Sequence, residues 1–402
     1  MSSMALSGAA GAWGRQVRAL FYVAMAVFLV TIGIGLLNGL DLVEFNHDQL
    51  LTHVHSGTIG WITLSLVAAS AWFNRGIDQR LAWALAIIVP VYVLSFYLAI
   101  SWLRAAAGGL LLIAILWLVV WAWGVYSSRR SLPALAIALG FTTFTYGAVI
   151  GVLRQVQLAG GPTLFSGTAD VVGAHASAMV FSYLILVAMG LLEWRLRGTT
   201  GLPVAGLVQL GALFAGGLVL SGAFLFLSGD AIQAAGGVDL LVNIVAVVIF
   251  AVRVVPAALR TDWLAGAGRH LSAAAIFVLI AMAIFMYVVY RFISDPAVAA
   301  DPTSIGGILV ASDHSAFIGV ITNLVFGLLL AMTADRGDRW PWASQVAFWG
   351  TNLGLVVFLV GLVAESSMLK MVGAPVMGIS LLVGLAVLAM RLRDSDLRAD
   401  PE

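Results

Sequence analysis

Twelve long apolar stretches, separated by short segments with charged, glycine or proline residues, constrain the fold of this chain most. A helix needs about 20 apolar residues to cross the hydrocarbon core of a bilayer. Because backbone groups in lipid must find hydrogen bonds within the protein, each stretch is expected to be a helix. The sequence therefore predicts an all-α polytopic membrane protein with spans at roughly 17–40, 50–73, 81–102, 105–126, 133–153, 172–194, 203–227, 236–258, 270–292, 312–334, 342–364 and 372–391.

The composition agrees with this fold class and limits the chemistry. Hydrophobic residues make up 62% of the 402 residues and charged residues only 10%, far from the usual composition of soluble domains. The net charge of +1 offers no electrostatic attraction to nucleic acid. Because the chain has no cysteine, it cannot form disulfides, thiolate metal sites or covalent haem attachments. Histidine, methionine and carboxylate remain as metal ligands.

The positions of the basic residues predict how the chain is oriented. If the N-terminus is cytoplasmic, sixteen of the 20 Lys and Arg residues fall in cytoplasmic segments, and only Arg104, Arg154, Arg291 and Lys370 fall outside. Cytoplasmic loops of membrane proteins carry such an excess of Lys and Arg. We therefore predict that both termini are cytoplasmic. The expected location is a bacterial-type cytoplasmic (inner) membrane, with lipid around the helices.

Three histidines lie near the predicted outer ends of the second, sixth and tenth helices. His55, His175 and His314 are each followed by two small residues, and an Ile-Thr pair recurs at the same distance after His55 and His314. This similarity predicts a unit of four helices repeated three times within a single membrane domain, residues 1–402. The pseudo-repeats would cover roughly 17–126, 133–258 and 270–391.

An ionisable side chain inside a membrane span is costly and indicates a functional site by default. A single histidine is equally well explained as an interfacial residue bonded to a carbonyl, but three at matching positions favour a metal or haem site. Neutral imidazole is a good iron ligand, and two imidazoles from facing helices can hold a haem without cysteine. His53 lies two residues before His55, on a different helix face. Both therefore cannot bind one iron, and alignment of the repeats favours His55.

These segments resemble subunit I of the haem–copper oxidase and nitric oxide reductase superfamily. Thr52-His53-Val54-His55-Ser-Gly-Thr-Ile-Gly-Trp61 is similar to the second-helix haem segment of its shorter members, and Ser312-Asp313-His314 to the tenth-helix segment. The resemblance implies that His55 and His314 are the axial ligands of a low-spin haem b. It also implies a copper ligand, or a ligand of a second haem, at His175.

The chain departs from this superfamily at the oxygen-binding site. The superfamily's seventh helix carries a His-His pair, whereas residues 203–227 contain no histidine, and Ser312 replaces the first histidine of the tenth-helix His-x-His. Reduction of dioxygen is therefore not expected. A bis-histidine haem remains, for electron transfer or for chemistry of a diatomic gas such as nitric oxide or dioxygen, as in the NnrS-type haem–copper proteins. If the chain is an enzyme, the resemblance implies an oxidoreductase.

Other polar residues suggest partners for a haem. Haem propionates need cationic or hydrogen-bonding partners, and Arg154, Arg291 and Lys370 are candidates at the outer surface, although simple placement at the interface explains each equally well. Quinol or a c-type cytochrome is the electron partner that the resemblance suggests. No oligomeric state follows from the sequence.

Two further expectations concern function. No chain of buried carboxylates crosses the cytoplasmic half of the predicted spans, so we expect no proton pump. The alternative to a haem protein is a transporter, or a haem- or copper-handling protein without redox turnover. Transporters often contain inverted repeats and broken helices; the threefold repeat disfavours this alternative, whereas the scarcity of redox ligands favours it.

Overall fold

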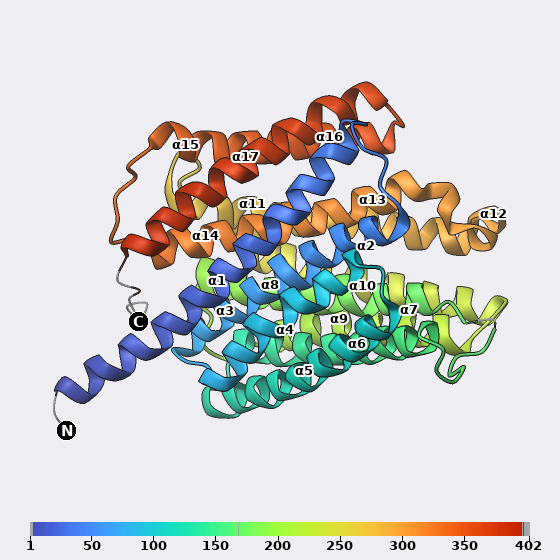
Figure 1. Cartoon of the computed structure of the whole chain (residues 1–402), viewed down its shortest axis with the longest axis horizontal. Coiled ribbons are helices and arrows are strands. Elements are labelled where there is room, and N and C mark those ends of the chain that lie inside the picture. The colour runs from blue at the N-terminus through green and yellow to red at the C-terminus, as the bar shows by residue number, and fades with distance from the viewer. Residues whose placement is uncertain (1–2, 168, 396, 398–402) are drawn as a thin grey trace. The chain divides into compact units, whose positions relative to one another are not determined.

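The computed structural model describes residues 3–167, 169–395 and 397, which form helices and contain no strand (Figure 1). Twelve helical spans in this part of the chain are long and apolar enough to cross a membrane. The all-α polytopic fold is thus confirmed, whereas the threefold repeat of a four-helix unit and the single domain stay predictions. The spans are Trp13–Gly39 of α1 (Ser3–Gly39), His47–Asn74, α4 (Gln79–Tyr97), α5 (Ser101–Arg129), α6 (Leu132–Leu158), Val171–Arg197, α9 (Val204–Phe226), α10 (Asp230–Ala258), α11 (Gly266–Ser294), Pro302–Met332, Pro341–Val363 and α17 (Ser367–Asp394).

Short polar side chains begin several of these helices. The Asn46 side chain accepts a hydrogen bond from the Gln49 N–H, and the Gln49 side chain accepts one from the Asn46 N–H. Asp78 and Ser131 similarly accept bonds from the first N–H groups of α4 and α6. These caps satisfy donors that have no partner within the helix. Gly198, with φ of 61°, ends the span Val171–Arg197 in the left-handed conformation, which glycine adopts without strain.

The tenth span begins at Pro302, well before the predicted start near residue 312. The predicted loop 292–311 includes instead α12 (Pro296–Ala300), a 3₁₀ turn (Pro302–Ile305) and the beginning of α13 (Gly306–His314). A pair of glycines in a sequence indicates the end of a helix, because each glycine costs about 1 kcal/mol in a helix interior. Here Gly306 and Gly307 begin α13, and glycine is tolerated at a helix start.

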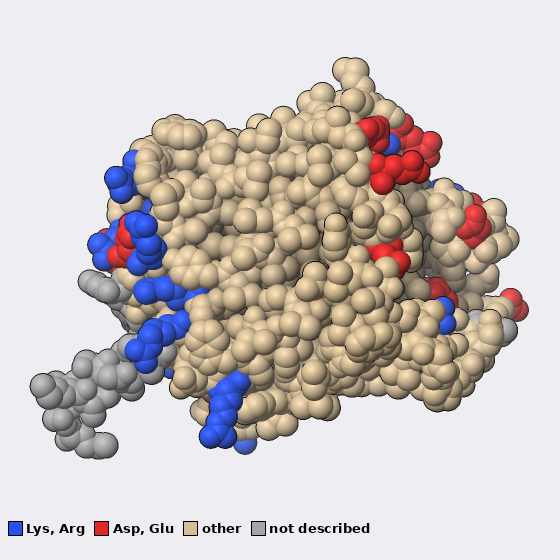
Figure 2. Space-filling view, in the orientation of Figure 1, with Lys and Arg blue, Asp and Glu red and all other residues tan. Residues whose placement is uncertain are grey.

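The chain divides into two compact units. The first unit contains residues 1–100, 262–270 and 322–402, and the second contains 101–261 and 271–321. In the first unit, basic side chains gather at the end where α1 begins and α17 ends, and carboxylates gather at the opposite end (Figure 2). This separation is the asymmetry from which the sequence predicts orientation. The cytoplasmic position of the termini stays a prediction.

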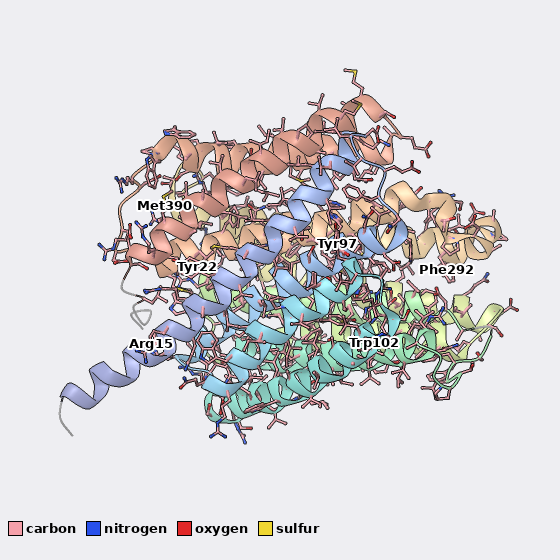
Figure 3. All side chains as sticks on the ribbon, viewed as in Figure 1. Arg15, Tyr22, Tyr97, Trp102, Phe292 and Met390 are labelled. Atoms are coloured by element: carbon pink, nitrogen blue, oxygen red, sulfur yellow. The ribbon has the colours of Figure 1, made fainter. Side chains whose placement is uncertain are left out.

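Within the first unit, α1 and α17 lie side by side. The Arg18 guanidinium donates to the backbone carbonyl of Ser395 at 2.7 Å, and the Tyr22 hydroxyl donates to that of Ala389 at 3.2 Å. Figure 3 shows Tyr22 and Met390 at this contact. In both bonds a side chain of α1 donates to a backbone carbonyl at the C-terminal end of α17, so the two bonds join α1 to that end.

Within the second unit, a buried ion pair links two spans to α9. Arg253 of α10 lies 3.1 Å from Glu193, which is only 1% exposed. The guanidinium also donates to Gln209 of α9 at 3.3 Å, and the Thr199 hydroxyl donates to the Glu193 carboxylate at 2.8 Å. A buried charge is tolerated when it is paired and hydrogen-bonded in this way.

Three of the twelve spans are much more buried than the others. In His47–Asn74, Val171–Arg197 and Pro302–Met332, 89, 78 and 83% of the residues in the most apolar window are buried, whereas the other nine spans range from 33 to 56%. The three buried spans are those that carry His55, His175 and His314. Their side chains therefore contact other helices on most faces, as expected of helices that hold an internal site.

Candidate functional site

The three histidine-bearing spans share one irregularity of the backbone. In each, an α-helix changes to a π-helix: α2 (His47–His55) to η1 (Ser56–Thr63), α7 (Val171–Ser177) to η2 (Ala178–Leu184), and α13 to η5 (Ser315–Thr322). π-Helical segments are rare and occur frequently at functional sites. The change gives each span an internal reference point from which residues can be compared.

His55 and His314 occupy the same position, the last residue before the π-helix. The Nδ1 atom of His55 bonds the carbonyl of Leu51 at 2.8 Å, and that of His314 bonds the carbonyl of Val310 at 2.9 Å. Both acceptors lie four residues earlier in the same helix. Because a carbonyl can only accept, we infer that Nδ1 carries the proton and that Nε2 carries a lone pair. A histidine that binds metal through Nε2 has this tautomer, in which the Nδ1–H group donates to a carbonyl and fixes the ring.

His53 and His175 share a different geometry. His53 Nδ1 bonds the carbonyl of Thr31 in α1 at 2.9 Å, and His175 Nδ1 bonds the carbonyl of Gly147 in α6 at 2.8 Å. Four residues after each acceptor stands a glycine that makes room for the ring. A Cβ atom built on Gly35 would lie 2.9 Å from His53 Cε1, and one on Gly151 would lie 2.9 Å from His175 Cε1. Each ring therefore bridges its own helix to the preceding span.

The structure changes the alignment of the three repeats. The sequence suggests that His55, His175 and His314 are equivalent, but His175 stands two residues before the end of α7, just as His53 stands two residues before the end of α2. The residue that corresponds to His55 and His314 is Ser177, whose hydroxyl donates to the carbonyl of Gly173, again four residues earlier, at 2.8 Å. Small residues follow His55, His175 and His314 alike, which is why the sequence favours their alignment.

Aromatic side chains of α4 hold the ring of His55. The imidazole stacks on Phe96 with ring centroids 3.9 Å apart and an interplanar angle of 16°. Tyr92 meets it edge-on at 6.0 Å. Stacking and the bond to Leu51 together limit rotation of the ring, and such restraint orients a ligand before it binds metal.

The predicted ligands are distributed over both units. His53 and His55 belong to the first unit, whereas His175 and His314 belong to the second. The pairing of His55 with His314 across one haem therefore stays a prediction. Among the residues that the structure describes, no three His, Asp or Glu side chains form a metal-binding group; an axial haem site needs only two imidazoles.

The predicted propionate partners lie near helix ends. Arg291, in the last turn of α11, donates to Asp295 at 2.9 Å and to the Tyr287 hydroxyl at 3.3 Å. This bond from the Arg291 guanidinium holds the pKa of Asp295 below its ordinary value. Arg154 lies near the end of α6 and Lys370 in the first turn of α17, both partly exposed. Their role toward a haem stays a prediction.

Sequence reasoning missed two buried carboxyl groups in the second unit. Glu193 and Asp239 are each 1% exposed. Asp239 could have been noticed, because it is the only acidic residue in the predicted span 236–258 and a charge inside an apolar stretch indicates a function by default. Glu193 lies near a predicted helix end, where the sequence does not distinguish a buried group from an interfacial one.

Comparisons with known proteins add no family assignment. No protein-family model matches the chain, and no curated protein matches it in sequence. The functional argument therefore depends on the residues and their geometry.

Proposed function

We propose that this chain is a membrane haem b protein in which His55 and His314 are the axial ligands of a low-spin haem. The observation that carries the proposal is their matched geometry. Both imidazoles end an α-helix at the change to a π-helix, and both bond a carbonyl four residues earlier through Nδ1. The second nitrogen of each ring then carries the lone pair that iron binds.

The protein's contribution would be to hold two neutral imidazoles at fixed orientation. The Nδ1 bonds to Leu51 and Val310 keep each ring in one tautomer and increase the basicity of Nε2. The stack on Phe96 restrains His55 further. A bound haem would supply one-electron chemistry, with a potential set by its axial ligands and surroundings. Arg154, Arg291 and Lys370 would bind its propionates.

The proposed role is electron transfer in a bacterial-type inner membrane, from quinol or a c-type cytochrome, or chemistry of a diatomic gas. If His55 and His314 hold a haem, it would supply one-electron transfer. Chemistry of a gas would call for a further metal-binding residue. His175 is the candidate ligand for a second haem or copper.

Visible spectroscopy of the purified protein tests the haem assignment. Wild type is expected to show a low-spin b-type band in the reduced-minus-oxidised spectrum, and His55→Ala and His314→Ala to lose it. His47→Ala is the matched control, because His47 begins α2 at an exposed position. A wild-type spectrum without the band, or one that neither ligand variant changes, overturns the proposal.

Two measurements refine the role. Carbon monoxide should leave the reduced spectrum unchanged if both imidazoles stay bound, and a shifted spectrum would favour gas chemistry. Metal analysis of wild type and His175→Ala tests the second site. Equal copper and iron contents in the two proteins would remove His175 from the set of metal ligands.

A further inference from the structure

An acidic residue, Asp239, lies inside the second unit on the buried face of α10. Asp239 is 1% exposed and Asn243, one helical turn later, is 2% exposed. The Asn243 Nδ2 group donates to Asp239 Oδ1 at 2.9 Å. Asp239 and Asn243 form an isolated polar contact on this face. The other buried residues of α10 are apolar: Gly236, Ala246, Val247, Phe250, Val254 and Ala258.

Two oxygen atoms of this pair have no donor among the residues that the structure describes. They are Asp239 Oδ2 and Asn243 Oδ1, both fully buried. A buried acceptor without a hydrogen bond costs about 1–3 kcal/mol. A buried carboxylate ion without a cation costs more. The pair as it stands therefore lacks one donor and one positive charge.

A single proton on Asp239 Oδ2 supplies both. It neutralises the carboxyl group, and it converts Oδ2 from an acceptor into a hydroxyl donor for Asn243 Oδ1. The protonated carboxyl and the amide would then exchange two hydrogen bonds, one in each direction. One bound proton therefore satisfies both atoms without moving a second residue into the site.

The helices packed against Asp239 supply no competing charge. α9 approaches at Gly216, where a Cβ atom would lie 2.9 Å from Asp239 Oδ1, and α9 has no charged residue. On α10 itself, Asp230 lies at the exposed start, and Arg253 is paired with Glu193. Neighbouring elements carry Arg195 and Arg197 of η3 (Glu193–Arg197), at the opposite end of α10 from Asp230. α11 carries Arg269 and His270 near its start and Arg291, which bonds Asp295, in its last turn.

We propose that Asp239 and Asn243 form a proton-binding site inside the second unit, in which Asp239 takes up and releases the proton. Asp239 lies about 14 Å along the helix from Asp230 at the start of α10, so the site is inside the span rather than at its end. The site depends on its own contacts and not on the haem. One carboxyl group does not form a chain across the protein, so the site is distinct from a pump.

Carbodiimide labelling of the full-length protein tests this site. Dicyclohexylcarbodiimide is apolar and reacts with protonated carboxyl groups, so mass spectrometry should find it on Asp239, with loss of the label as the pH is raised. Asp239→Asn should abolish the label, and Asp230→Asn should leave it unchanged. Absence of label on Asp239 at every pH where the protein stays folded overturns the proposal. Protection by sodium ions at constant pH also overturns it, because the ligand would then be a metal cation.

Infrared spectroscopy gives a second readout that does not require a reagent. Wild type should show the C=O stretch of a protonated carboxyl group that shifts to lower frequency in D₂O. Asp239→Asn should remove the band. Asn243→Leu should shift it to higher frequency, because the carbonyl loses the hydrogen bond from Nδ2. A spectrum without a band that responds to Asp239→Asn overturns the proposal.

Discussion

The segments around His55 and His175 have the same change from α-helix to π-helix, but a different residue stands at that change. In both, an α-helix changes to a π-helix, and a histidine two residues before the end of the α-helix bonds a carbonyl of the preceding span. The last α-helical residue is His55 in one segment and Ser177 in the other. The comparison teaches that a histidine two residues before the change bonds the preceding span. The histidine at the change to the π-helix is what the second and tenth spans share.

The largest expected effect is the difference in haem content between the His55→Ala and His53→Ala variants. If the position before the π-helix binds iron, His55→Ala removes a ligand and should lower the haem content by more than the 10–100-fold typical of losing a ligand's hydrogen-bond partner. His53→Ala should keep the haem, because its ring serves contact with α1. Haem content per protein, measured by absorbance of the extracted haem, decides between them. Loss of haem in His53→Ala with retention in His55→Ala would contradict the assignment of the ligand to the position before the π-helix.

Two glycines test whether His53 and His175 are equivalent. In Gly35→Ala and Gly151→Ala, the new Cβ would crowd the imidazole at 2.9 Å, and overpacking typically costs about 1–3 kcal/mol. We expect similar decreases in melting temperature for both variants. Gly33→Ala is the control on α1, because nothing lies within 4 Å of its Cβ position. It should be neutral or stabilising, by up to about 1 kcal/mol.

Unequal losses in Gly35→Ala and Gly151→Ala would contradict the equivalence. So would a loss in Gly33→Ala as large as that in Gly35→Ala, because the effect would then come from glycine replacement in α1 in general. Thermal unfolding of the three variants in one detergent provides both comparisons.

The smallest expected effect concerns the tenth span. Ser312 stands two residues before His314, at the position of His53 and His175, and its buried hydroxyl has no hydrogen-bond partner among the described residues. Ser312→Ala should therefore stabilise the protein by up to about 1 kcal/mol. Ser177→Ala, which loses only a bond within its own helix, should stay within about 0.5 kcal/mol of wild type. A clear loss of stability in Ser312→Ala would indicate that this position also bonds a neighbouring helix.

Much of the fold could be predicted from the sequence, because a bilayer imposes a length on each apolar stretch. All twelve predicted spans correspond to helices. The error at the tenth span has a local cause, since the glycines at 306 and 307 are tolerated at the start of α13. The caps at Asn46, Asp78 and Ser131 follow the preference of short polar residues for helix starts.

The candidate site could be predicted only in part. The sequence predicts His55 and His314 as a pair of haem ligands, and this pairing stays a prediction; the structure gives both rings the same hydrogen bond. The alignment of His175 with them was wrong, because sequence similarity could not reveal where the backbone changes from α to π. Asp239 was missed because its significance depends on burial and on a missing donor.

The sequence by itself determined that this chain forms twelve apolar helices and that the second, sixth and tenth carry a histidine near the predicted outer end. The physical reason is that lipid offers no hydrogen bonds to the backbone and penalises every polar group. Only the tertiary structure decided which carbonyl each ring bonds. His53 and His175 reach the preceding span because Gly35 and Gly151 let the helices approach closely, and such an approach depends on residues far apart in the chain.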